Sequence, residues 1–148
     1  MKIMIDTNII ISAALNPNGR AAQAFVKALL YPCEPMVCDY IVDELHRKFQ
    51  EKFPDRMVEL EAFLYSALKI IRLVPTPNDE TRSEKRIRDV KDRPILRAAV
   101  AAKADYLLTG DADFLESGVN YPQMINAAAF LSMNPDEVEY DATERTKD

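Results

Sequence analysis

Four carboxylates are the residues of this sequence best placed to support a reaction: Asp6, Glu44, Asp92 and Asp111. Asp6 and Asp111 each follow a short apolar segment, where strands of a parallel sheet would end. Carboxylates gathered within a few ångströms repel one another, so they must separate, take up protons or bind cations. Oxygen ligands favour Mg²⁺ or Mn²⁺, and Mg²⁺ often binds substrate phosphates as well. Any one of these acids could be a helix cap or turn residue, but their joint placement predicts metal-dependent hydrolysis of phosphodiester bonds.

The sequence lacks the residues that several other kinds of catalytic site need. The three glycines, Gly19, Gly110 and Gly118, are too few for the phosphate-binding loops of dinucleotide- or nucleotide-binding folds. One histidine and two cysteines, Cys33 and Cys38, exclude the usual zinc sites and most nucleophilic triads. Both cysteines are expected to be reduced and structural, because two are too few for a disulfide framework.

Strands and helices alternate along the chain in a pattern that would position these acids. Residues 6–16 are expected to form a loop that ends in a cluster of turn residues at 16–19. Strands are expected at residues 3–5, 36–38, 70–74 and 106–108, and helices at 20–30 and 56–69. Three further helices are expected to begin with the capping residues Asp39, Asp92 and Asn126.

This alternation predicts an α/β protein. Right-handed crossovers between parallel strands would give a three-layer α/β/α sandwich with a mainly parallel central sheet. Residues 1–133 are expected to form one domain, because 148 residues can bury one substantial core. Functional residues should then lie at the carboxyl ends of the strands.

The net charge of −5 is concentrated at the C-terminus. Residues 134–148 hold six acids and two bases, a net charge of −4, which leaves −1 for residues 1–133. This segment lacks hydrophobic periodicity and is expected to be a mobile acidic tail. The sequence has no apolar run of bilayer length and no signal peptide, so a cytoplasmic location without membrane association is expected.

A basic segment gives the nearly neutral domain a candidate RNA-contact surface. Residues 82–93 carry six bases against three acids. The candidates for phosphate contacts are Arg86, Arg88, Lys91 and Arg93. A solvated loop leading into a helix is the alternative interpretation.

Four pieces of the sequence, in order, resemble the motifs of PIN domains. Residues 3–10 (IMIDTNII) are similar to the opening motif of that family, and residues 106–111 (YLLTGD) to its later strand-and-acid motif. Between them, residues 39–44 resemble its acid-bearing helix, and residues 89–96 (DVKDRPIL) its acidic segment at the start of the next helix. The resemblance extends to about Leu131 and is strongest to the toxin components of bacterial and archaeal toxin–antitoxin pairs, the VapC-like ribonucleases.

The resemblance implies a ribonuclease that uses Mg²⁺ or Mn²⁺. The acids implied as catalytic and metal-binding are Asp6, Glu44, Asp92 and Asp111, with Asp113 as a further metal ligand. The implied supporting residues are Asn8, Thr109 and Asp89. Asp89 is a rival of Asp92 for the third ligand position, and Asp92 is preferred because it is nearer the helix start. An RNA substrate, a cognate antitoxin and a homodimer are the implied partners.

Two other functions compete with the nuclease. One is a PIN-like scaffold that binds RNA or protein without cutting. The other is an Asp-nucleophile phosphatase of the haloacid-dehalogenase kind, with Asp6 as nucleophile. That motif needs a second acid two residues later, where this sequence has Asn8.

Overall fold

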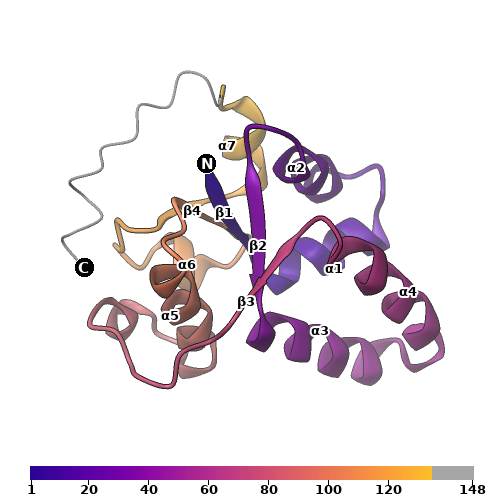
Figure 1. Ribbon diagram of the computed structural model, residues 1–148, viewed down its shortest axis with the longest axis horizontal. Helices are drawn as coiled ribbons and strands as arrows, with labels where there is room; N and C mark the ends of the chain where they lie inside the picture. The colour runs from indigo at the N-terminus through magenta and orange to yellow at the C-terminus, as the bar shows by residue number, and fades with distance from the viewer. Residues whose placement is uncertain (135–148) are drawn as a thin grey trace.

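The structure is a computed structural model that describes residues 1–134. Apart from Asn134, the segment expected to be an acidic tail lies outside the described residues. Figure 1 shows a central sheet with helices packed on both sides of it. Its strands are β1 (Lys2–Ile5), β2 (Glu34–Cys38), β3 (Arg72–Val74), β4 (Tyr106–Leu108) and β5 (Gln123–Ile125). Its helices are α1 (Thr7–Leu15), α2 (Arg20–Leu29), α3 (Asp39–Lys52), α4 (Met57–Ala67), α5 (Arg93–Ala101), α6 (Ala112–Leu115) and α7 (Ala127–Ser132), with short 3₁₀ helices η1 (Pro54–Arg56), η2 (Ser83–Arg86) and η3 (Val90–Asp92).

The strands form one sheet in the order β3-β2-β1-β4-β5, and every neighbouring pair is parallel. The chain runs from β1 outward to β3 and then returns across the sheet to β4 and β5. With right-handed crossovers, that reversal places the helices before and after it on opposite faces. In Figure 1, α1, α2 and α4 accordingly lie on one side of the strands, and α5 and α6 on the other. The expected α/β/α sandwich with a parallel sheet is confirmed.

The core is continuous through the two central strands. Residues Ile3, Met4 and Ile5 of β1 are fully buried, as are Leu107 and Leu108 of β4. Both strands are covered by helices on both faces, so they do not alternate, and Lys2 at the start of β1 is their only charged residue. Among the residues that the structure describes, none belongs to a helix with the length and apolar composition needed to cross a membrane.

Helix α1 corrects the expectation of a loop after the first strand. The Asp6 side chain accepts a hydrogen bond from the backbone N–H of Thr7 and begins the helix. Ile9 and Ile10 are β-branched and have modest helix propensity, but both are buried. Packing of this segment against α2 therefore outweighs its weak intrinsic preference for helix.

Smaller corrections concern the ends of elements. Strand β3 begins at Arg72, and Ile70 is 61% exposed in the turn after α4. Helix α3 begins at Asp39, so its N-cap is Cys38 and not Asp39. Asn126 does cap α7, because its side chain accepts a hydrogen bond from the N–H of Ala129. The sequence did not reveal α6 or β5, which have four and three residues and no clear periodicity.

Candidate active site

Two of the candidate acids follow β1 and β4, the neighbouring strands at which the chain changes the direction in which it adds strands to the sheet. Asp6 follows β1 directly, and Asp111 follows β4, the parallel neighbour of β1. The N–H of Asp6 donates to the carbonyl of Leu108 at 2.9 Å, which holds the two strand ends together. Helix α1 leaves toward one face of the sheet and α6 toward the other, so the ends of β1 and β4 form the topological switch point of the sheet. In open α/β sheets, ligands bind at this kind of position.

Asp6 is an acid whose charge is poorly accommodated. It is only 3% exposed, and its two oxygens accept hydrogen bonds from the N–H of Thr7 and the hydroxyl of Thr109, both at 2.8 Å. Burial raises the pKa of Asp6 to about 6, the two hydrogen bonds oppose the rise, and the charges of Glu44 and Asp111 add to it. Asp6 therefore lies within electrostatic reach of two other candidate acids.

Thr109 connects the two strand-end acids. Its hydroxyl donates to Asp6 and accepts a hydrogen bond from the N–H of Asp111 at 3.0 Å. The side chain of Asp111 in turn accepts from the N–H of Asp113 at 2.9 Å and caps α6. A chain of hydrogen bonds thus fixes the segment from Thr109 to Asp113.

Glu44 reaches the site from α3. It is only 5% exposed, and two basic side chains of its own helix flank it. Arg47 Nη2 lies 3.6 Å from one carboxylate oxygen and Lys48 Nζ lies 3.8 Å from the other. Lys48 also donates to the side-chain oxygen of Asn8 at 3.2 Å, so Asn8 contacts a basic residue of α3.

Asp92 has a carboxyl group with a strongly raised pKa. Burial, together with the charges of Asp111, Asp89 and Asp6, raises the pKa of Asp92 to about 7. A hydrogen bond between the Asp92 and Asp111 carboxyl groups contributes to the rise, because it requires a proton on one of them. Asp92 occupies the N-cap position of α5, but its side chain makes no capping hydrogen bond and is available to the site.

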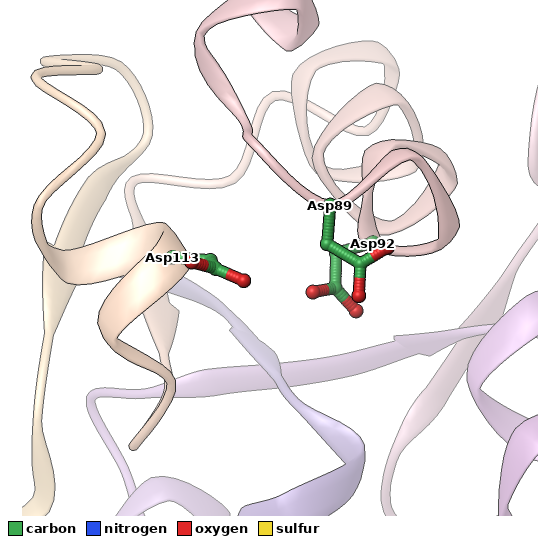
Figure 2. Close-up of side chains that lie close together, drawn as sticks. All are labelled: Asp89, Asp92 and Asp113. Carbon is green, nitrogen blue, oxygen red and sulfur yellow. The ribbon is translucent and has the colours of Figure 1, made fainter.

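The closest group of potential metal ligands is Asp89, Asp92 and Asp113, whose ligand oxygens lie within 4.8 Å of one another. Figure 2 shows Asp89 and Asp92 side by side at the start of α5, facing Asp113 on α6. Asp89 also caps η3 by accepting from the N–H of Lys91 at 3.0 Å. Asp89 and Asp92 therefore both belong to the carboxylate group, although the sequence treated them as rivals. A set made only of carboxylate oxygens fits Mg²⁺ or Mn²⁺.

The four basic residues predicted to contact RNA differ in their surroundings. Arg88 pairs with Asp113 at the site and is largely exposed, and Lys91 is exposed on η3. Arg86 donates to the carbonyl of Gly118, and Arg93 uses its Nε to bond the carbonyl of Ile87. Arg88 and Lys91 therefore have the more available side chains.

Sequence reasoning missed three side chains that adjoin the acids: Tyr40, Arg47 and Lys48. The Tyr40 hydroxyl donates to the carbonyl of Lys91 at 2.5 Å and so fastens α3 to the η3 segment. All three lie three or four residues from Glu44, which places them near it on one helix surface. That spacing from a suspected ligand was the signal available in the sequence.

Comparison with models of known protein families shows to which family the chain belongs. A model of the PIN domain family matches residues 2–113, a span that contains every acid described above. The chain belongs to the PIN domain family. A search of curated proteins found no match for this PIN domain protein.

Solved structures share the fold of this PIN domain protein. VapBC2 from Rickettsia felis, bound to a DNA fragment from its promoter, matches with a TM-score of 0.64 at 16% identity, over 85% of this chain and 98% of that chain. VapBC-1 from nontypeable Haemophilus influenzae matches with a TM-score of 0.62 at 18% identity, over 86% and 99%. FitAB bound to the IR36 DNA fragment matches with a TM-score of 0.55 at 20% identity, over 84% and 94%.

Proposed function

We propose that this PIN domain protein is an endoribonuclease that depends on Mg²⁺ or Mn²⁺. The residues proposed as catalytic metal ligands are Asp6, Glu44, Asp92 and Asp111, together with Asp113, and Asp89 supports them. The observation that carries the proposal is the gathering of acids at the ends of β1 and β4, where burial and the charge of Asp111 raise the pKa values of both Asp6 and Asp92. A divalent cation relieves that repulsion and leaves the carboxylates ionised at neutral pH.

When bound, a divalent cation supplies charge stabilisation at the phosphate and activation of water, so a histidine base is not needed. The protein residues hold and orient the carboxylates. Thr109 fixes one oxygen of Asp6, and the Asp111 cap on α6 fixes the position of Asp113. Arg88 and Lys91 are proposed to contact RNA phosphates beside the acids, with Arg86 and Arg93 farther along the same segment.

The proposed biological role is that of the toxin in a toxin–antitoxin pair, acting in the cytoplasm. Two of the solved structures with this fold are VapBC complexes, and the third is FitAB. Exposed apolar side chains on two helices that pack together support a protein partner: Val26 on α2 is 54% exposed, and Val58 and Tyr65 on α4 are 82% and 71% exposed. Phe25 of α2 and Phe63 of α4 join these helices, with ring centroids 5.9 Å apart. An antitoxin or a second copy of the chain could cover such side chains.

The chemistry of Asp6 favours the nuclease over the phosphatase. An Asp-nucleophile phosphatase needs a second acid two residues after its nucleophile to act as the general acid. The position two residues later is Asn8, which bonds Lys48 and cannot act as a general acid. A non-catalytic scaffold gives no reason for acids that repel one another to be gathered at one end of the sheet.

The decisive experiment compares RNA cleavage by the purified chain in EDTA, Mg²⁺ and Mn²⁺, after mass analysis shows that no partner has co-purified. Asp6→Asn and Asp111→Asn should lower the metal-dependent rate by at least a hundredfold, as is typical when a group that stabilises the transition state is lost. Asp43→Asn, an exposed acid of α3, is the matched control and should cleave at the wild-type rate. Equal cleavage by all four proteins, or none by the partner-free wild type, would contradict the proposal.

A further inference from the structure

One face of α3 carries three functional side chains in a row: Tyr40, Glu44 and Lys48. They are four residues apart, so they lie on one side of the helix about one turn from each other. Tyr40 contacts η3 through the carbonyl of Lys91, and Lys48 contacts α1 through Asn8. This face of α3 therefore spans the site from the η3 segment to α1, with Glu44 in the middle.

The ammonium group of Lys48 lies at the α1 end of this row. Its side chain is 30% exposed, so the stem is mostly covered while solvent can still reach the residue. An ammonium group has three N–H donors, and the hydrogen bond to Asn8 uses one of them. The oxygen of Glu44, at 3.8 Å, is close enough for an ion pair but beyond hydrogen-bond distance. The group thus has donor capacity for a ligand that enters the site.

The charge arrangement around the acids favours a phosphate as that ligand. On the η3 side, Arg88 pairs with Asp113 and Lys91 is exposed. On α3, Arg47 and Lys48 flank Glu44, and Lys48 is the one that contacts α1. An RNA backbone that crosses the acids carries phosphates on both sides of the one being cut. A cation bound by Glu44 would weaken the attraction of that carboxylate for Lys48 and leave the ammonium group available to a phosphate.

We propose that Lys48 contacts a backbone phosphate of RNA bound across the carboxylates, on the α1 side of Glu44. The contact would set the path of the RNA strand over α3, opposite the contacts made by Arg88 and Lys91. This inference rests on the proposed nuclease function for its substrate. The alternative is that Lys48 only positions Glu44 and Asn8 and never touches RNA.

The test measures binding separately from cleavage. Fluorescence anisotropy follows a labelled single-stranded RNA binding to the Asp111→Asn protein in Mg²⁺ at several salt concentrations. Adding Lys48→Gln should reduce the slope of log affinity against log salt by about 0.7, the value for one phosphate contact with a single strand. Lys48→Arg should keep the slope. Lys52→Gln removes the same charge from an exposed position one turn later on α3 and should also keep it.

Each other outcome has a distinct meaning. An unchanged slope in Lys48→Gln, an equal loss in Lys52→Gln, or no RNA binding by the Asp111→Asn protein would overturn the contact. Thermal unfolding of each variant checks that a changed slope comes from folded protein. Failure of the nuclease proposal would show elsewhere, as a partner-free wild type that does not cleave RNA in Mg²⁺ or Mn²⁺. Steady-state cleavage adds a second readout, in which loss of the contact should raise KM severalfold.

Discussion

Substituting Asp6 by Asn should stabilise the metal-free protein at pH 8, although it removes a proposed catalytic ligand. Burial raises the pKa of Asp6 from 3.8 to about 6, so the folded protein holds this proton more tightly than the unfolded chain. That contribution is complete below about pH 4 and is lost as the pH rises through about 6. At 1.36 kcal/mol per pKa unit, the loss is about 3 kcal/mol. Asn cannot ionise, but one of its side-chain atoms can no longer accept a hydrogen bond, which costs about 1 kcal/mol. The net gain expected for Asp6→Asn is about 2 kcal/mol.

Urea unfolding in EDTA at pH 8 and pH 4 measures this effect, with Asp43→Asn as an exposed-acid control. Asp6→Asn should exceed the wild type at pH 8, and the advantage should disappear at pH 4, where Asp6 is protonated in the folded state. Saturating Mn²⁺ should reverse the order, because binding at 100 times Kd adds about 2.7 kcal/mol to the protein that binds it. If Asp6→Asn is less stable than wild type at pH 8 without metal, the ionised Asp6 is not strained and the reasoning fails.

Three further predictions concern other parts of the molecule. The affinity for Mn²⁺, measured by calorimetry, should fall as the pH drops below about 7. The reason is that the pKa of Asp92 is raised to about 7 and its carboxyl group must lose its proton to bind a cation. An affinity independent of pH between 5 and 8 would refute this prediction. Glu84→Gln should lower the free energy of unfolding by about 3 kcal/mol, because Arg97 is only 14% exposed and would lose its charged partner at 2.8 Å. Replacing both residues by Leu should cost less stability than this single substitution. Lys27→Met should destabilise the protein by about 2 kcal/mol in a urea titration, because the ammonium group bonds two backbone carbonyls at the end of α7, and an unchanged midpoint would show that these bonds contribute nothing.

The sequence predicted the central strands of the sheet because residues 3–5 and 106–108 are short apolar runs that end in polar residues. It failed for α1, where the run of Ile9 and Ile10 gives no local sign of a helix and burial against neighbouring helices decides the conformation. It also failed for β5, whose residues Gln123 to Ile125 form a strand by pairing with β4. Local preference was a good guide only where it agreed with packing.

The sequence by itself determined which residues can bind a cation and at which ends of the strands they stand, because chemical type and strand limits are local properties. Tertiary structure decided which acids meet. The sheet order places β1 beside β4, and the packing of η3 against α6 brings Asp89 and Asp92 within ligand distance of Asp113. Tertiary packing also placed Lys48 of α3 against Asn8 of α1, 40 positions apart in the chain. Distances between side chains on separate elements depend on sheet order and helix packing, and no local pattern in the chain encodes them.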